Sequence, residues 1–156
     1  MGGQYELARE LEHVLHHEIP LTQQIGLAVA GYDGARLALR APLASNINHK
    51  ATAFAGSLTA VATLAGWGMV WLILRERGLR GVIVIHQSAS EYRLPVSGDF
   101  VATCQTPTER AVERFLHGLQ RHGKARLSLA VEIRTESDEI AVAFTGSYVA
   151  FSASAD

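Results

Sequence analysis

The chain has 156 residues, of which 48% are hydrophobic and 19% charged, with 14 basic and 15 acidic side chains. This length predicts one domain, and the apolar fraction excludes wholesale disorder. The balanced charge gives no basic field for a nucleic-acid partner, and the single cysteine, Cys104, excludes an internal disulfide. The opening segment lacks a secretory pattern, so we expect a cytoplasmic protein. We also expect no metal and no cofactor.

The first elements follow from the spacing of apolar residues. Helical spacing predicts a helix over about 4–17, and Pro20 ends it. Alternation on both sides of Asp33-Gly34 predicts a hairpin of strands over 25–29 and 36–40. A polar loop over 42–53 then leads into the central part of the chain.

That central part holds no charged residue between Lys50 and Arg75, and Leu58–Leu74 is almost continuously apolar. Such a stretch is long enough for a thin membrane span, but an apolar helix is otherwise one that its own protein buries. The neighbouring segments have the pattern of strands, so we expect no membrane partner. We predict a buried helix over about 53–77, with Gly78 as its stop.

The remaining elements complete an α+β pattern. Strands are predicted over 82–88 and 99–105, and Thr106 is the predicted cap of a helix that ends at Gly123. Alternation then predicts strands over 125–134 and 140–148. Six strands around one apolar helix suggest an antiparallel sheet that curls around it, with a partner subunit or the flanking helices covering the remainder.

Four segments carry a family resemblance, and they read NINHKATAFAGS (46–57), LAGWG (64–68), YRLPVSGD (92–99) and FTGSY (144–148). They resemble the hotdog superfamily of thioesterases and dehydratases, in particular a thioesterase domain found behind some acetyltransferase domains. The resemblance implies a single hotdog domain over residues 1–156. It also implies a homodimer or homotetramer with active sites at subunit interfaces and acyl-CoA or acyl-carrier-protein thioesters as substrates.

The resemblance also places a site. Many hotdog thioesterases carry Asn-x-x-Gly-x-x-His-Gly-Gly before the helix, and here Asn48 holds the Asn place, Phe54 the His place and Ala55-Gly56 the two Gly places. The carboxylate that many of these enzymes carry inside the helix falls near Thr63, which is uncharged.

Thioester hydrolysis needs a polarised carbonyl and an activated water. Backbone N–H groups of Ala55 and Gly56, at a helix start, can bind the oxyanion that forms. We predict that Asn48 positions the substrate and that His49 is the base, because histidine can take a proton near neutral pH. An Asx turn at Asn48 and backbone hydrogen bonds at His49 are the alternative roles. Further predicted substrate contacts are Phe54, Ser57, Thr63, Trp67, His86 and Tyr92.

Three functions are compatible with these residues. The first is hydrolysis of acyl thioesters. The second is a non-catalytic acyl- or lipid-binding module, which the uncharged Thr63 favours. The third is an enoyl dehydratase or hydratase, which needs a histidine paired with a carboxylate, and His86 with Glu91 is the pair close in sequence.

Overall fold

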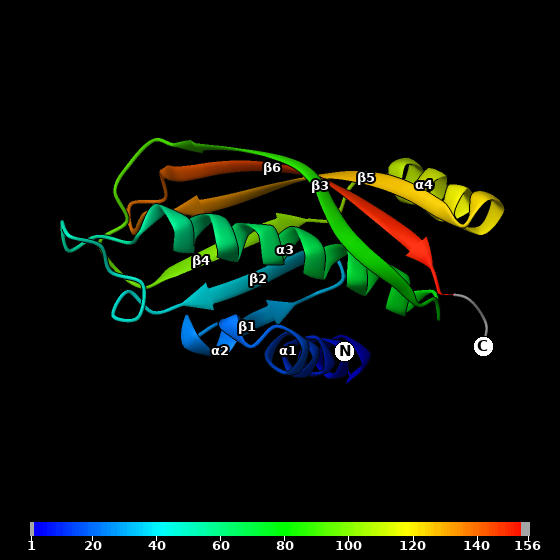
Figure 1. The fold of residues 1–156 in the computed structure, drawn as a ribbon, viewed down its shortest axis with the longest axis horizontal. Helices are drawn as coiled ribbons and strands as arrows, with labels where there is room; N and C mark the ends of the chain where they lie inside the picture. Colours follow the sequence, from blue (N-terminus) through cyan, green and yellow to red (C-terminus); the bar gives the residue numbers. More distant parts are fainter. Residues whose placement is uncertain (1, 154–156) are drawn as a thin grey trace.

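The computed structural model describes residues 2–153, and its main feature is a six-stranded antiparallel sheet that curls around one long helix (Figure 1). All of its pairings are antiparallel. In spatial order the strands are β1 (Ala28–Tyr32), β2 (Arg36–Ala41), β4 (Phe100–Gln105), β5 (Lys124–Arg134), β6 (Ile140–Ser152) and β3 (Gly81–Tyr92). The predicted hotdog architecture is therefore confirmed.

The central helix is α3 (Ala55–Glu76), which lies in the concave face of the sheet. It is long and apolar enough to cross a membrane, yet 67% of its most apolar window is buried inside the protein. The helix ends at Arg77, and Gly78 follows with a φ of 66°, as the sequence predicts. The protein thus buries most of the apolar surface of α3.

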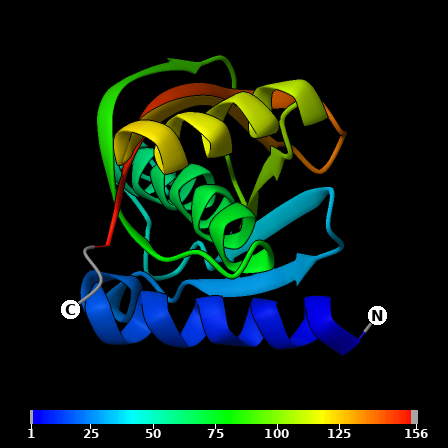
Figure 2. The same ribbon diagram turned by 90° about the vertical axis from the view of Figure 1, so that its right-hand side faces the viewer.

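Three further helices flank this core. The helix α1 (Gly2–Glu18) and the short α2 (Leu21–Gln24) lie beside β1, while α4 (Glu109–His122) packs on the outer face of the sheet against β5 and β6 (Figure 2). In α4 the cap is Thr108 rather than the predicted Thr106, because the Thr108 hydroxyl accepts a hydrogen bond from the Ala111 N–H. The sequence patterns also missed α2.

One buried tyrosine joins the sheet to the central helix. The Tyr148 hydroxyl on β6 donates a 2.7 Å hydrogen bond to the Thr63 carbonyl of α3. A Cβ at Gly66 would lie 2.5 Å from Tyr148 Cζ, and a Cβ at Gly146 would lie 2.7 Å from Tyr148 Cε2. Both glycines therefore make room for this ring, which explains the FTGSY segment as a packing motif.

The strand β3 forms one edge of the sheet and is longer than predicted. It pairs with β6 through Tyr92, with an irregularity between Ile85 and Gln87. Its polar second half gives no alternation of apolar residues, which is why the sequence pattern ended it at residue 88. Apolar side chains are exposed along this edge, at Val82, Val84, Ile85 and Tyr92.

Candidate active site

The start of α3 presents free backbone N–H groups to the solvent. Phe54 is the N-cap, in extended conformation, and no side chain in the described chain caps the helix. The first helical hydrogen bond runs from the Leu58 N–H to the Phe54 carbonyl at 3.1 Å. The N–H groups of Ala55, Gly56 and Ser57 precede it and have no intrahelical acceptor. Ala55 and Gly56 are exposed, so an acyl carbonyl can approach them.

The Phe54 ring covers Gly56. A Cβ on Gly56 would lie 2.9 Å from Phe54 Cζ and 3.1 Å from Cδ1, so the absence of a side chain there leaves space for the ring. The Phe54 side chain is itself 55% exposed. The ring forms an apolar surface beside the helix start. Because Phe54 is not part of the buried core, its side chain can rotate outward without leaving a cavity in the core.

Two hydroxyl groups stand beside this helix start. Tyr92, at the end of β3, places its hydroxyl in hydrogen-bonding contact with the Thr59 hydroxyl in the first turns of α3. The same Tyr92 hydroxyl lies 3.5 Å from the Ala55 carbonyl oxygen. The sequence analysis named Tyr92 as a substrate contact but did not name Thr59. The contact between the two residues depends on how the sheet wraps around α3, which the sequence pattern does not show.

The loop before α3 is held by the amides of two asparagines. Asn46 is buried, and its Nδ2 donates to the carbonyls of Ile25 at 2.9 Å and Pro42 at 2.7 Å. The Asn46 carbonyl in turn accepts from the Phe54 N–H at 2.7 Å, which fixes where the helix begins. Asn46 therefore positions the site from beneath, a role that only its burial reveals.

Asn48 is bonded within its own loop. Its Oδ1 accepts from the N–H groups of Lys50 at 2.8 Å and Thr52 at 3.2 Å, and its Nδ2 donates to Thr52 Oγ1 and the Ala53 carbonyl. This is the Asx-turn role. The turn continues at Ala51, which stands where the resembled pattern has glycine and has a φ of 61°.

The other predicted residues lie in the turn before α3, along α3 and on β3. His49 is exposed in the turn before α3, and Ser57 is half-buried in the first turn of the helix. Trp67 lies further along α3, where its indole N–H donates to the Ile83 carbonyl at 3.1 Å. His86 is exposed in the β3 irregularity, six residues and about 20 Å along the strand from Tyr92.

The pair considered for a dehydratase does not form within the described chain. Glu91 is bound to Arg93, with Oε1 2.9 Å from Nε, and this guanidinium lowers the pKa of the Glu91 carboxyl. Glu91 is thus held as a carboxylate by a neighbour other than His86. Among residues 2–153, no group of three or more histidine, cysteine or acidic side chains is placed to hold a metal ion.

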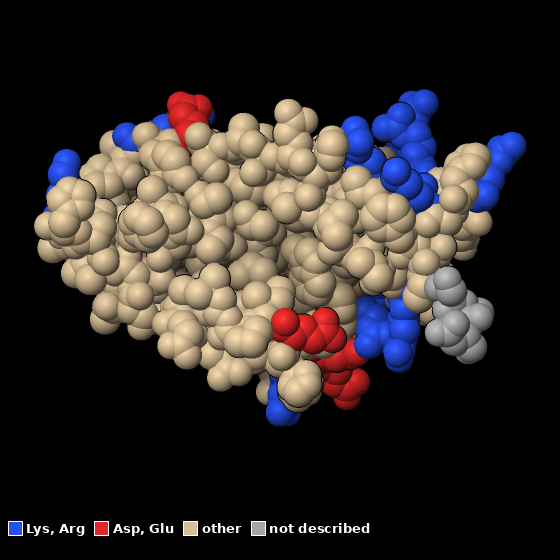
Figure 3. Space-filling view, viewed as in Figure 1, with Lys and Arg blue, Asp and Glu red and all other residues tan. Residues whose placement is uncertain are grey.

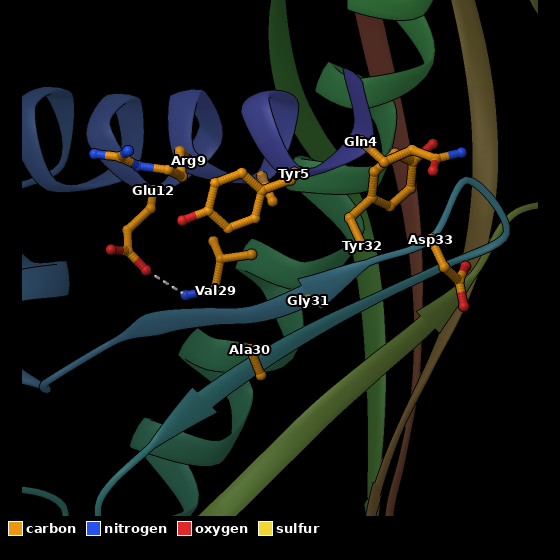
Figure 4. Close-up of a pocket in the computed structure, with 10 residues that line it drawn as sticks. Gln4, Tyr5, Arg9, Glu12, Val29, Ala30, Gly31, Tyr32 and Asp33 are labelled. Carbon is orange, nitrogen blue, oxygen red and sulfur yellow. Dashed lines mark hydrogen bonds between the residues drawn. The ribbon is translucent and has the colours of Figure 1, made fainter. Parts of the chain in front are cut away.

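A separate groove of about 500 Å³ lies between α1 and β1 (Figure 4). In it the Glu12 carboxylate accepts a 2.7 Å hydrogen bond from the Val29 N–H. The hydroxyl of Tyr32, which also lines the groove, donates to Glu76 of α3 at 2.7 Å. Burial, followed by this carboxylate neighbour, raises the pKa of Tyr32. These bonds shield an edge strand of the sheet, so we assign the groove a structural role.

An antiparallel sheet around a central helix defines a hotdog-fold protein. The family described as "Putative thioesterase (yiiD_Cterm)" matches residues 8–152, and the chain belongs to this family.

Solved structures agree with this assignment. A Chlorobaculum tepidum protein described as of unknown function is 34% identical, with 96% of this chain and 97% of that chain covered and a TM-score of 0.93. A Shewanella oneidensis protein described as a putative thioesterase is 32% identical, with 94% of this chain and 98% of that chain covered and a TM-score of 0.85. A Pseudomonas aeruginosa protein described as a probable thioesterase is 23% identical and shares the fold, with a TM-score of 0.80. The match covers 93% of this chain and 95% of that chain.

Proposed function

We propose that this protein hydrolyses acyl-CoA or acyl-carrier-protein thioesters at the start of α3. The observation that carries the proposal is the exposed N-terminus of α3, where the N–H groups of Ala55 and Gly56 have no intrahelical acceptor. Such donors, with the positive end of the helix dipole, stabilise the oxyanion that forms when water attacks a thioester carbonyl. Membership of a thioesterase family gives the reaction class.

The proposed reaction has one nucleophilic step. A water oxygen bonds to the carbonyl carbon, the carbon–sulfur bond breaks, and the products are a carboxylic acid and a free thiol. His49 takes the proton of the water and returns it to the leaving thiolate. Between Asn46 and Leu74 the side chains that titrate are His49 and Lys50, which leaves His49 as the neutral acceptor of that segment.

We further propose that the working unit is a homodimer joined through the edge strand β3. Apolar side chains are exposed along this edge. Beside it, the side of α3 that the sheet leaves open carries half-buried apolar residues, including Leu64, Trp67 and Trp71. A second copy related by a two-fold axis pairs antiparallel with β3 and covers both features.

This symmetry determines what faces the site. The end of β3 at Tyr92 lies by the start of α3, whereas the beginning of β3 at Gly81 lies by Leu74 near the end of α3. In an antiparallel β3–β3 pair, the end of β3 in one copy lies beside the beginning of β3 in the other copy. Each helix start therefore faces the cleft of about 180 Å³ that contains Trp71 and Arg80 of the other copy, and this supports a site at the subunit interface.

Kinetics of thiol release from short, medium and aromatic acyl-CoAs test the proposal. Gly56→Leu blocks the approach to the helix N–H groups, and the exposed Phe54 ring can move to admit the new side chain. We expect kcat/KM to fall at least about 100-fold, the usual effect of losing an oxyanion donor. Gly31→Leu on β1 is the matched control, since a Cβ there meets nothing within 4 Å. Equal rates for wild type and Gly56→Leu would refute the assigned site.

A second function is favoured by the lack of charged residues from Ala55 to Leu74 of α3, where Thr63 stands at the place of the carboxylate of many hotdog thioesterases. In that case the protein binds acyl thioesters without cleaving them. Tight binding of an acyl-CoA, without thiol release at any pH between 5 and 9, would establish this function in place of hydrolysis.

A further inference from the structure

The exposed face of α4 carries a row of basic side chains. Arg110, Arg114, His117 and Arg121 are spaced by four, three and four residues, so they lie on one side of the helix. All four are exposed. The opposite side of α4 is apolar and packs on the sheet through Val112, Phe115, Leu116 and Leu119.

These arginines have no acidic partner in the part of the chain that the structure describes. The ion pairs of residues 2–153 involve Arg75, Arg93 and Arg134, all outside α4. Like charges four residues apart, as at Arg110 and Arg114, destabilise a helix slightly. Figure 3 shows Lys and Arg gathered where α4 and the start of β5 lie, with no Asp or Glu visible there. The exposed Glu109 and Glu113 lie on the same helix, so the three arginines leave α4 with a net charge of +1, with histidine neutral, on a protein whose net charge is −1.

The fold places this basic face at the same end of the molecule as the beginning of β3. The Ser152 N–H donates to the Gly123 carbonyl just after α4 at 3.0 Å, and Ser152 pairs with Gly81. In the proposed dimer this end lies beside the α3 start of the other copy. The α4 helix of one subunit therefore lies at the same end of the dimer as the site of its partner, on the outer face of the sheet, whereas α3 lies in the concave face.

We propose that the basic face of α4 docks an acidic acyl carrier protein, which delivers its thioester to the α3 start of the other subunit. This inference rests on the proposed function. A carrier protein presents its acyl group on a flexible arm, so it needs a docking surface away from the carbonyl site, whereas a CoA thioester does not. The recognition is electrostatic and sets the rate of encounter more than the chemistry.

A protein partner fits this surface better than a lipid surface does. A peripheral membrane helix combines basic residues with exposed large apolar side chains that enter the bilayer. The exposed large apolar residues of the described chain, such as Tyr5, Phe54 and Val82, all lie outside α4. The face of α4 is therefore purely polar, as expected for contact with an acidic protein.

Binding is the first test, because it does not depend on turnover. We expect Arg110→Glu/Arg114→Glu/Arg121→Glu to weaken the binding of an acidic acyl carrier protein at least 10-fold at 50 mM salt. The affinity of wild type should also fall steeply as salt rises. Equal binding by both proteins, or binding of wild type to anionic phosphatidylglycerol vesicles but not to the carrier, would overturn the inference.

The matched control reverses the same number of charges elsewhere. Arg9→Glu/Arg36→Glu/Arg40→Glu changes α1 and β2, at the other edge of the sheet, and should leave carrier binding within twofold.

Turnover separates this inference from the proposed function. The α4 variant should lose at least 10-fold in kcat/KM with an acyl-carrier-protein thioester and keep its kcat/KM with an acyl-CoA. An equal loss with both substrates would contradict a docking role. Carrier binding through α4 without hydrolysis of either substrate would instead refute the proposed function and leave the docking surface in place.

Mixed dimers test the placement across the interface. A dimer of the α4 variant and Gly56→Leu combines an intact site on one copy with an intact basic face on the other. We expect this co-expressed dimer to hydrolyse the carrier thioester at about half the wild-type rate, although each parent is nearly inactive. No recovery would show that docking and catalysis use the same subunit, against the inference.

Discussion

Replacing Gly66 by alanine should destabilise the protein although the position lies inside a helix. In an ordinary helix this change stabilises by up to about 1 kcal/mol. Here the added Cβ would lie 2.5 Å from Tyr148 Cζ and 2.6 Å from Cε2. Tyr148 is fully buried, and a Cβ at Gly146 would already lie 2.7 Å from the same ring, so the ring has no free space to move into.

The magnitude follows from two costs. Overpacking a core costs about 1–3 kcal/mol. Displacing the ring also breaks the bond from the Tyr148 hydroxyl to the Thr63 carbonyl, which costs about 1–3 kcal/mol when a buried partner is left unpaired. After the helix-propensity gain of up to about 1 kcal/mol is subtracted, we expect a net loss of about 1–5 kcal/mol.

Urea unfolding at fixed protein concentration, followed by the fluorescence of Trp67 and Trp71 on α3, measures this loss. Gly118→Ala in α4 is the control, because its Cβ would meet Ala125 Cβ at an ordinary 3.5 Å. That variant should be as stable as wild type or up to about 1 kcal/mol more stable. If Gly66→Ala behaves like Gly118→Ala, the packing of Tyr148 against α3 is not what the structure indicates.

Further predictions concern the loop, the edge strand and pH. Ala51→Gly should raise the free energy of unfolding by about 1 kcal/mol, because Ala51 has a φ of 61°; a decrease would refute strain there. Asn48→Asp keeps the Oδ1 acceptor of the Asx turn, so it should retain more thioesterase activity than Asn48→Ala; equal losses would assign a direct role to the amide. Ile85→Lys on the exposed edge of β3 should shift the proposed dimer toward monomer in light scattering and lower acyl-CoA turnover; an unchanged oligomeric state would place the interface elsewhere. Burial raises the pKa of Cys104 from 9.0 to about 12, so its contribution to stability is complete below pH 9 and is lost as pH rises toward 12. The unfolding free energy of Cys104→Ala should therefore fall less steeply over this range than that of wild type.

The fold could be predicted because its strongest signals are local. The uncharged stretch predicts a buried helix, Asp33-Gly34 predicts the first hairpin, and Gly78 and Gly123 mark two helix ends with positive φ. The second half of β3 was missed because an exposed edge strand needs no apolar alternation. The cap of α4 was misplaced by two residues because two threonines flank Pro107 and either has the right chemistry.

The start of α3, where we propose the site, was predictable in position, and its contacts were less so. The segment at Phe54–Gly56 was identified, and it does form the free start of α3. The contact of Tyr92 with Thr59 joins residues 33 apart, so no local pattern shows it. The loop bonds of Asn48 also depend on a turn whose geometry the residue types leave open.

The most direct test of the account is a crystal structure of the protein with a 2-oxoalkyl-CoA, a non-hydrolysable ketone analogue of an acyl-CoA in which a CH2 group separates the carbonyl from the sulfur. We predict that the carbonyl oxygen of the analogue lies about 3 Å from the N–H groups of Ala55 or Gly56. We also predict that the second subunit closes the cleft beside it. A carbonyl bound elsewhere, with the start of α3 unoccupied, would contradict the central claim.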